Sequence, residues 1–581
     1  MINIKLNGKD IEVRDNQTIH NICKENNIDI PTLCHLNLHE IGYFNAPGSC
    51  RICVVEIANQ GNKLVTSCNT VATEGMEIIT HSPKAVKARK NVVELLISNH
   101  PNDCLYCDKN TSCELQQIAY DLGVRKVKYE GERNIMEVHP HSSPSIIQDP
   151  NKCILCKRCE TMCSLIQKVN AIGQSNRGFE TRISSTFNMN LTDGTCTSCG
   201  QCVAVCPTGA LMEVSNIDNV WDALMDKTKT VVVQTAPAVR VALGEEFGYE
   251  PGTDVTGKMV TALRELGFDY VFDTNFAADL TIVEEGNEFM QRLEAGGPFP
   301  IITSCCPAWV NFMENQFPDM IQYVSSVKSP HEMNGAVIKN YFAEKKNLHP
   351  KRIVTVSVMP CVAKKYEAER EELGGHWGQD VDIVITTREL ARMIKEAAIG
   401  FNTLKESDFD DPLGESTGSA TIFGATGGVI EAVLRSVHEK VTGDVLDQAL
   451  EFKELRGFKG IKTTAVEIEG TTYDIAVTNG LGNVRKLMES VRKGENKFHA
   501  IEVMACPGGC VGGAGQPYHH GDFTLLDKRA AGLFKKDQKQ ALRVSHHNPD
   551  VIKLYEEYLG EVGGDLAHEL LHTHYEAKCK Y

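Results

Sequence analysis

The sequence predicts a multidomain protein that is α+β in its N-terminal third and α/β in the remainder. Its 581 residues exceed a single ordinary domain. Its 22 cysteines are unevenly spread: sixteen lie at or before Cys206, and none occurs from 207 to 304. Near residue 217 the pattern of hydrophobic residues changes, and predicted buried strands begin to alternate with predicted helices. These observations predict four domains, over 1–80, 81–140, 141–216 and 217–581.

The overall composition excludes several classes of protein. The 60 Lys and Arg against 76 Asp and Glu leave a net charge of −16, which argues against a nucleic-acid binder because such a protein needs a basic face. No apolar run approaches the roughly 18 residues of a membrane span. The polar N-terminus lacks the apolar core of a signal peptide. We therefore expect a cytoplasmic protein, in which so many thiols bind clusters or metals and do not form disulfides.

The first domain reads as a small β domain. Residues 1–13 have two strand-like runs separated by Asn7-Gly8, which is typical of a hairpin. Four cysteines then follow on loops, a set that suits a [2Fe–2S] cluster in a β-grasp ferredoxin-like domain, although the spacing alone leaves zinc open. Cys23 lies in a helical stretch and is interpreted as a buried apolar residue. The four predicted ligands are Cys34, Cys50, Cys53 and Cys68.

The second domain begins with helical periodicity over 84–98. A compact set of one histidine and three cysteines follows, His100-x3-Cys104-x2-Cys107-x5-Cys113. Such a donor set can also hold zinc. A lone histidine is usually no ligand, but His100 completes a tight local set, so we expect it to bind a [4Fe–4S] cluster.

The third domain contains an internal repeat. The pattern C-x2-C-x2-C-x3-C occurs at 153–163 and again at 196–206, as in bacterial two-cluster ferredoxins, where the fourth cysteine of each run binds the other cluster. Four clusters in the first three domains require 16 ligands, which equals the sixteen early cysteines without Cys23 and with His100. One predicted [4Fe–4S] set is Cys153, Cys156, Cys159 and Cys206, and the other is Cys196, Cys199, Cys202 and Cys163.

The fourth domain is long enough to form two α/β lobes. Its glycine-rich loops at 424–428 and 507–515 match neither a P-loop nor a dinucleotide-binding spacing. We interpret them as tight turns or as close packing around a cofactor.

Three late motifs carry a family resemblance: TSCCPAW at 303–309, MPCVAKKYE at 359–367 and EVMACPGGC at 502–510. They resemble the three signature motifs of the [FeFe]-hydrogenases, TSCCPxW, MPCxxKxxE and ExMxCxxGCxxGGGQP. The four-cluster N-terminal half is similar to that of the large clostridial-type enzymes, so the resemblance covers nearly the whole chain. Ala514 is a departure, because the family usually has glycine there.

The resemblance implies an H-cluster, a [4Fe–4S] unit bridged by a thiolate to a diiron unit with CO, cyanide and azadithiolate. Lys364 would hydrogen-bond a cyanide ligand. The implied cubane ligands are Cys306, Cys361, Cys506 and Cys510, with Cys510 bridging to the diiron unit. The residues implied to pack close to the cofactor are Met359, Met504, Ala236 and Pro237, although simple core filling also explains the methionines.

The resemblance also implies a proton route that begins at Cys305, the proton donor to the bridging amine. A free thiol titrates near about pH 8.5, which suits transfer near neutrality if it is modestly tuned. Glu285, Glu288 and Arg292 share one face of a predicted helix, a pattern that is usually a solvated charged face. The resemblance instead assigns Glu285, Glu288 and Ser325 to the relay, with Arg292 at its mouth.

Other departures favour a multi-subunit, NAD-linked enzyme. His331 and Ala238 stand where clostridial monomers often carry Gln and Ser. The implied partners are ferredoxin and separate flavin- and NAD-binding subunits, because this chain has no flavin or nucleotide motif; maturation proteins are also implied. The tail offers His568, His572, His574 and Cys579, either as a metal site or, as we expect, as an ordinary exposed tail.

The predicted function is reversible 2H⁺ + 2e⁻ ⇌ H₂ by an [FeFe]-hydrogenase subunit of an NAD(H)- and ferredoxin-linked electron-bifurcating complex. One alternative is a stand-alone ferredoxin hydrogenase. Two others are an electron-transfer subunit that resembles part of NADH:quinone oxidoreductase and a non-catalytic iron–sulfur assembly protein. The joint presence of Cys305, Lys364 and Glu288 argues against the last two.

Overall fold

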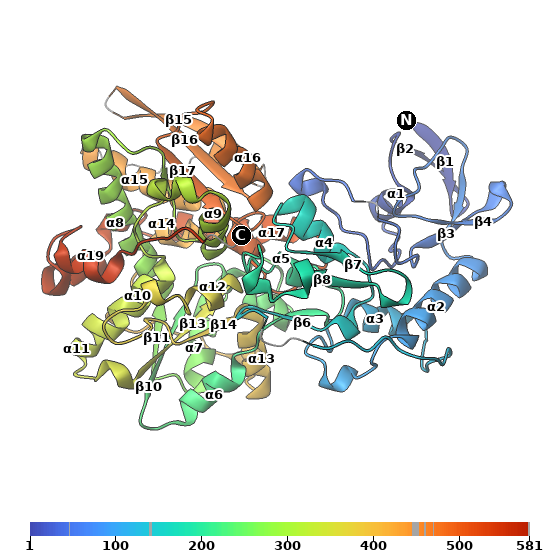
Figure 1. Ribbon diagram of the computed structural model, residues 1–581, viewed down its shortest axis with the longest axis horizontal. Coiled ribbons are helices and arrows are strands. Elements are labelled where there is room, and N and C mark those ends of the chain that lie inside the picture. Colours follow the sequence, from blue (N-terminus) through green and yellow to red (C-terminus); the bar gives the residue numbers. More distant parts are fainter. Residues whose placement is uncertain (46, 139–141, 444–452, 458–459, 469, 579–581) are drawn as a thin grey trace.

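The computed structural model describes residues 1–581 except 46, 139–141, 444–452, 458–459, 469 and 579–581. Cys579 therefore lies outside the described residues. The cysteine-rich N-terminal part occupies one end of an elongated molecule, and the two lobes of the C-terminal part lie one above the other at the opposite end (Figure 1).

The N-terminal domain is built on a five-stranded mixed sheet in the order β2-β1-β5-β3-β4. The predicted hairpin is confirmed, because its two strands pair antiparallel. Its turn residues Asn7 and Gly8 both have positive φ, at 50° and 84°. Helix α1 (Ile19–Glu25) packs its buried residues on the sheet and includes the fully buried Cys23, as predicted. The strands are β1 (Ile2–Leu6), β2 (Lys9–Val13), β3 (Val54–Ile57), β4 (Lys63–Thr66) and β5 (Glu77–Ile79).

Helix α2 (Pro83–Ser98) joins the first domain to the second. Ser82 caps it by accepting a hydrogen bond from the Ala85 N–H, and Pro83 occupies its first position, where no donor is needed. The buried Arg89 guanidinium donates to the carbonyls of Val54 and Thr80, which ties α2 to the sheet. Helix α3 (Glu114–Asp121) then packs against α2.

The cysteine repeat is also a repeat of backbone geometry. Leu155 and Ser198 occupy equivalent positions and have φ of 53° and 56°, and Lys157 and Gly200, with φ of 64° and 69°, precede equivalent short helices. These helices are α4 (Arg158–Thr161) and α5 (Gln201–Ala204). Two antiparallel pairs complete the domain: β6 (Ile146–Gln148) with β9 (Leu211–Glu213), and β7 (Ile172–Ser175) with β8 (Arg182–Ser185).

The first catalytic lobe contains a four-stranded, wholly parallel sheet in the order β11-β10-β13-β14. Its strands are apolar because helices cover both faces. The strands are β10 (Thr230–Thr235), β11 (Tyr270–Asp273), β13 (Ile353–Met359) and β14 (Ile383–Thr386). The helices of this lobe include α6 (Ile217–Met225), α7 (Thr256–Leu266) and α13 (Thr387–Glu396).

The second lobe contains a four-stranded sheet in the order β12-β17-β16-β15, whose edge strand β15 runs antiparallel to β16. The two sheets confirm the predicted two-lobed α/β architecture. The strands are β12 (Ile301–Ile302), β15 (Ile461–Ile468), β16 (Thr471–Asn479) and β17 (Ala500–Met504). The longer helices here and between the lobes are α8 (Thr274–Ala295), α9 (Pro307–Gln316), α15 (Gly428–Thr442), α16 (Leu481–Arg492) and α17 (Thr524–Lys539).

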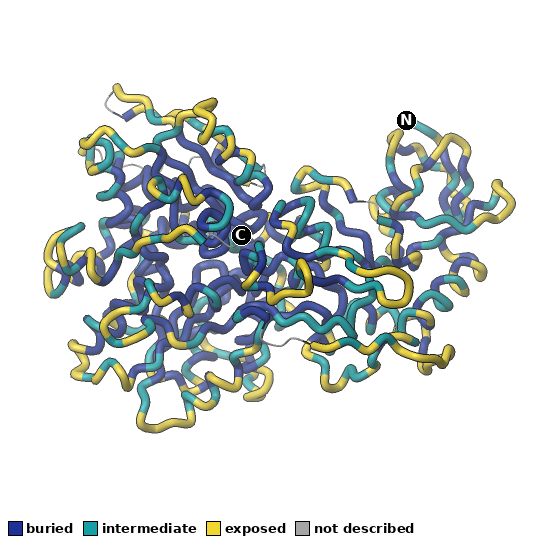
Figure 2. Tube along the Cα trace, in the orientation of Figure 1, coloured by how far each residue is buried: buried dark blue, intermediate teal, exposed yellow. Residues whose placement is uncertain are grey.

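Short helices complete the fold: α10 (Pro330–Val337), α11 (Ala343–Lys345), α12 (Ala363–Glu367), α14 (Gly418–Thr421), α18 (Pro549–Leu554) and α19 (Asp565–Leu571). The deeply buried chain is concentrated where the two lobes meet and exposed chain lies around the rim (Figure 2). None of the described helices is long and apolar enough to cross a membrane.

The C-terminal tail corrects a prediction. We expected an exposed tail, but α19 buries Leu570 and Leu571, and the Thr573 N–H donates to the Ser326 carbonyl. The Lys578 ammonium pairs with the fully buried Glu314 at 2.8 Å. The rings of His568 and His572 lie 4.1 Å apart, but His574 is exposed and pairs with Glu576, so the three described histidines of the tail do not form one cluster. The tail packs on the catalytic domain because α19 is amphipathic and because the residues after it make these contacts.

Candidate active site

A cavity of ≈ 80 Å³ lies between the two lobes, well above the roughly 10–15 Å³ that one water requires. It forms where strands of both sheets end, the usual position of ligand sites in α/β folds. β13 ends at Met359 and β17 at Met504, and both side chains line the cavity. The other lining residues singled out by the sequence are Ala236, Pro237, Cys305, Cys306, Lys364, Cys361, Cys506 and Cys510.

Four thiols from three distant segments converge in this cavity. Cys306 precedes α9, Cys361 follows β13, and Cys506 and Cys510 lie in the loop after β17. The four lie close enough to interact electrostatically, and none forms a disulfide. Soft thiolates in an apolar hollow are a donor set that fits an iron–sulfur cubane.

Glycines allow the loop after β17 to lie against the neighbouring backbone of Thr426 and Pro360. A Cβ on Gly509, whose φ is +91°, would lie 2.6 Å from the Thr426 nitrogen, and one on Gly513 would lie 2.2 Å from the Pro360 carbonyl oxygen. These distances show that the glycines allow close packing between loops, while the predicted packing around a cofactor stays a prediction.

Lys364 lies beside Cys305 at the cavity wall. Its ammonium donates to the Cys305 carbonyl at 3.2 Å, to the Ser329 hydroxyl at 2.9 Å and to the Glu367 carboxylate. Burial acts to raise the pKa of the Glu367 carboxyl group. The nearby Lys364 and His331 outweigh burial and lower this pKa to about 2. The result is a fixed buried cation that can hydrogen-bond an anionic group in the cavity.

Cys305 is a protonated thiol in this environment. Burial first, and then the neighbouring Glu285 carboxyl group, raise the pKa of the Cys305 thiol well above its ordinary value. This shift is larger than the modest tuning that we expected. Cys305 therefore holds its proton until a strong acceptor in the cavity takes it.

The charged face of α8 is mostly buried. Burial and the nearby Glu288 charge raise the pKa of Glu285 to about 8, so its carboxyl group is mainly protonated at neutral pH. The Ser325 hydroxyl donates to Glu288 Oε2 at 2.7 Å and lies beside the Glu285 carboxyl group, where it acts to lower the pKa of that group. Arg292 pairs with Glu288 at 2.5 Å. The structure thus brings Cys305, Glu285, Ser325, Glu288 and Arg292 together as a series of neighbours.

Two residues of the site were missed by sequence reasoning. Glu367 ends the second motif, and its spacing of three from Lys364 on a helix is a signal that could have paired them. Ser329 hydrogen-bonds both Lys364 and Glu367 but stands in no recognisable pattern. His331, noted only as a departure, lines the cavity and lies 3.0 Å from Glu367.

The cysteine repeat forms two further cavities, which follow the predicted crossed pairing. Each cavity is lined by three cysteines of one run and the fourth of the other. The first contains Cys153, Cys156, Cys159 and Cys206, and the second contains Cys163, Cys196, Cys199 and Cys202.

The cysteines of the first N-terminal donor set also converge. The Cys34 side chain lies within hydrogen-bonding reach of those of Cys50 and Cys68, and Cys53 lies within reach of Cys68. His100 is 9% exposed, and its Nε2 atom has no hydrogen-bond partner among the described residues. An orphaned, buried ring nitrogen fits a ligand, because a buried polar atom otherwise has a partner.

Shared hydrophobic cores connect these sites. One core contains Cys34 and Cys50 of the first set together with Cys113 of the second and Cys156 of the first ferredoxin-type cavity. Another contains Cys199 of the second ferredoxin-type cavity together with cysteines of the central cavity, and Cys199 interacts electrostatically with Cys506. A continuous series of thiol sites therefore runs from the N-terminal domains to the space between the lobes.

The fold and sites define a modular iron–sulfur redox enzyme, and comparison with known proteins gives the family. The description "Iron only hydrogenase large subunit, C-terminal domain" matches residues 229–514, and "Iron hydrogenase small subunit" matches 524–578. Three iron–sulfur descriptions match the N-terminal part: a 2Fe-2S cluster binding domain (1–83), an NADH-ubiquinone oxidoreductase-G iron-sulfur binding region (89–128) and a 4Fe-4S dicluster domain (152–210).

The chain belongs to the iron-only, or [FeFe], hydrogenase family. It is 51% identical to the NADP-reducing hydrogenase subunit HndD of Solidesulfovibrio fructosivorans over 99% of both chains. It is 41% identical to iron hydrogenase 1 of Clostridium pasteurianum over 99% of this chain and 100% of that one. A variant of apo HydA1 from Chlamydomonas reinhardtii superposes with a TM-score of 0.57 and 43% identity, covering 63% of this chain and 99% of that chain. These similarities confirm the predicted hydrogenase activity.

Proposed function

We propose that this chain is the hydrogen-converting subunit of a multi-subunit enzyme, with an H-cluster held between its two lobes. The observation that carries the proposal is the convergence of Cys306, Cys361, Cys506 and Cys510 in one buried cavity beside Cys305 and Lys364. The cluster, when bound, supplies the redox-active diiron unit at which 2H⁺ + 2e⁻ ⇌ H₂ takes place.

The chain's own residues position the cofactor and move the proton. The four cysteines would hold the cubane, and Cys510 would be the ligand that it shares with the diiron unit. Lys364 donates a hydrogen bond to an anionic ligand, because Glu367 and Ser329 fix its ammonium at the wall. Met359, Met504, Ala236 and Pro237 exclude water from the cavity.

Protons reach Cys305 through buried groups. Glu285 is mainly protonated at neutral pH and can replace the proton that Cys305 gives up. The Ser325 hydroxyl lies between Glu285 and Glu288, so it can receive a proton from one carboxyl group and donate to the other. Arg292, whose side chain is 13% exposed, holds Glu288 at the outer end of the route.

Electrons reach the cavity through four accessory clusters. We assign one [2Fe–2S] cluster to the first domain and three [4Fe–4S] clusters to the His100 set and the two ferredoxin-type cavities. The shared core of Cys34, Cys113 and Cys156 supports two input modules that meet at the first ferredoxin-type cluster. The second ferredoxin-type site would hold the cluster next to the central cavity, because Cys199 lies close to Cys506.

The partners are proposed to be flavin- and NAD(P)-binding subunits together with ferredoxin, and maturation proteins that supply the diiron unit. The similarity to an NADP-reducing hydrogenase subunit over the full chain supports this assignment. Leu105 and Tyr106 lie between two of the His100-set cysteines and are 87% and 90% exposed. Two large apolar side chains beside a cluster form a docking point for an electron-carrying partner.

Anaerobic infrared spectroscopy of matured protein, with iron counted on the same sample, tests the proposal. Bands from CO and cyanide with iron for five iron–sulfur clusters and a diiron unit are expected. Cys305→Ala should keep these bands and the iron but lose most turnover, whereas Cys23→Ala, in a buried cysteine remote from the cavity, should retain turnover. An absence of CO and cyanide bands despite filled clusters and proven maturation would contradict the assignment, and an active Cys305→Ala variant would contradict the relay.

A further inference from the structure

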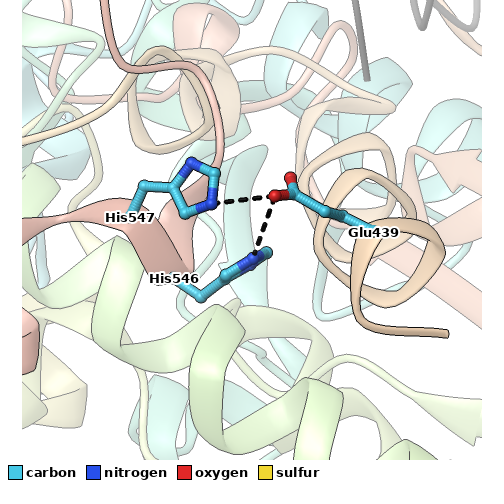
Figure 3. Close-up of side chains that lie close together, drawn as sticks. All are labelled: Glu439, His546 and His547. Atoms are coloured by element: carbon cyan, nitrogen blue, oxygen red, sulfur yellow. Dashed lines mark ion pairs between the residues drawn. The ribbon is translucent and has the colours of Figure 1, made fainter. Parts of the chain in front are cut away.

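Three side chains remote from the thiol sites converge near the end of α15 (Figure 3). Glu439 lies in the last turn of this helix, and His546 and His547 lie in a short turn, Ser545–His547, between α17 and α18. Glu439 Oε1 is 2.9 Å from His547 Nε2 and 3.8 Å from His546 Nε2. One ligand atom from each of the three residues lies within 4.8 Å of the others.

Ordinary ion pairing does not account for this arrangement. Glu439 is 9% exposed, and its second carboxylate oxygen has no hydrogen-bond partner among the described residues. Both imidazoles direct their Nε2 atoms at the same oxygen of this carboxylate. Two imidazole nitrogens and a buried carboxylate with one unpartnered oxygen are a donor set that suits a metal ion.

We infer that Glu439, His546 and His547 bind a divalent zinc-class metal ion. Zinc takes imidazole and carboxylate ligands at about 2.0–2.1 Å, so neighbouring donors of a tetrahedral site lie roughly 3.3–3.4 Å apart. The observed separations of 2.9 and 3.8 Å lie on either side of that value, so small side-chain shifts bring both pairs into range. The His547 side chain is 39% exposed, which gives an ion access and leaves room for a water as fourth ligand.

The site joins two parts of the chain that match separate family descriptions. Glu439 belongs to the large-subunit match over 229–514, and both histidines belong to the small-subunit match over 524–578. The turn of the histidines also packs against α8, the helix that carries Glu285 and Glu288. A bound metal would fasten the C-terminal segment to α15 and α8, and its role is therefore structural.

The His331, Glu332 and Glu367 group, which also brings metal-binding side chains together, does not compete with this assignment. It lies at the wall of the active-site cavity. There Glu367 accepts a hydrogen bond from Lys364 and pairs with His331. The Glu439 cluster has no such second role among the described contacts.

The test measures zinc and iron by mass spectrometry on the same samples of cluster-loaded holoenzyme after equilibration with zinc and gel filtration. Wild-type protein should retain one zinc per chain more than a Glu439→Gln, His546→Gln double variant at equal iron content. His574→Gln removes an exposed histidine that pairs only with Glu576 among the described contacts, and it should match the wild type. Equal zinc in the wild type and the double variant, at equal iron, would overturn the inference.

The single variant His547→Gln keeps the test decisive if the double variant does not fold. His547→Gln alters a partly exposed ligand and should weaken zinc binding at least about tenfold while the iron content stays constant. Zinc should also raise the unfolding temperature of wild-type protein and slow hydrogen exchange at 436–442 and 543–549, and it should do neither in the double variant. Unchanged affinity in His547→Gln would equally overturn the assignment.

Discussion

His572 Nε2 lies 3.2 Å from the carboxylate of Glu284, so the C-terminal tail packs directly on α8. The other ring nitrogen of His572 lies 2.8 Å from the Ser326 hydroxyl. The backbone N–H of Ser326 in turn donates to Glu288, at 3.2 Å from its Oε2 atom. The tail thus contacts both α8 and the segment of Ser325 and Ser326, between which the proposed proton route runs.

Replacing His572 with alanine should destabilise the catalytic domain. The change leaves Glu284, which is fully buried, without its imidazole partner, and such a loss costs about 1–3 kcal/mol. Denaturant unfolding followed by circular dichroism should show this loss. His574→Ala, in an exposed histidine two residues away, should stay within about 0.5 kcal/mol of wild type; equal losses in both variants would mean that His572 contributes nothing specific.

Ser325→Ala should slow turnover without removing a cluster. Its hydroxyl is the group that contacts both relay carboxyls, and positioned proton transfer contributes about 10²–10⁴-fold to a rate. We expect hydrogen production with a chemical reductant to fall by at least about 10²-fold while the iron content is unchanged. Ser326→Ala is the control, because its hydroxyl contacts His572 and not the relay. A fully active Ser325→Ala enzyme would show that protons take another route.

Stability should fall as the pH rises from about 4.5 to about 8, in part because of Glu285. Burial and Glu288 raise the pKa of this residue from 4.5 to about 8, so the folded chain holds a proton that unfolding releases in this window. Release on unfolding means that higher pH favours the unfolded state. Unfolding temperatures at pH 6 and 8.5 should therefore differ more for the wild type than for Glu285→Gln. An identical difference in both proteins would mean that Glu285 is not shifted.

Gly200→Ala should damage the contact between the second ferredoxin-type loop and the active-site loops. A Cβ there would lie 2.2 Å from Val362 and 2.6 Å from the Ala514 methyl. Overpacking of this kind costs about 1–3 kcal/mol. Gly123→Ala is a matched control, since Gly123 has nearly the same φ, +66° against +69°, with nothing within 4 Å of its added Cβ. The difference in unfolding free energy between the variants measures the clash, and no difference would show that the loops simply move apart.

Tyr106→Asp should uncouple the enzyme from its partner but not from small reductants. Tyr106 is 90% exposed beside the His100 set, so a charge there disturbs docking and leaves the core intact. Hydrogen production from NAD(P)H with the partner subunits should fall at least about tenfold, while production from reduced methyl viologen should not change. Phe187→Asp, at a residue that is 91% exposed, serves as control. If neither variant affects the NAD(P)H-driven rate, the docking point lies elsewhere.

Much of this architecture was accessible from spacing alone. The ferredoxin-type repeat predicts that Cys206 lies with the first run and Cys163 with the second, and they line the two cavities in this way. The equal spacing of the two runs also appears as matching backbone turns at Leu155 and Ser198. The central site depended on family motifs, since Cys306, Cys361 and Cys506 are far apart in the chain and only the folded lobes bring them together.

Other features depend on tertiary contacts that have no local signal. The burial of Glu285 comes from the segments packed around α8, and its charge pattern by itself indicates a solvated face. The docking of His572 on Glu284 likewise joins residues 288 positions apart. Nothing in the local sequence near Glu439 indicates the two histidines that approach it from beyond residue 540.

The close packing at Gly200 has a consequence for electron flow. The loop of the second ferredoxin-type site presses against Val362, next to Cys361, with no space for one extra methyl group. The two loops are not expected to move relative to each other, because close-packed interiors resist deformation. With clusters bound as proposed, the distance between the second ferredoxin-type site and the central cavity would then be fixed. This contact between the loops is therefore expected to contribute no control over the rate of electron supply.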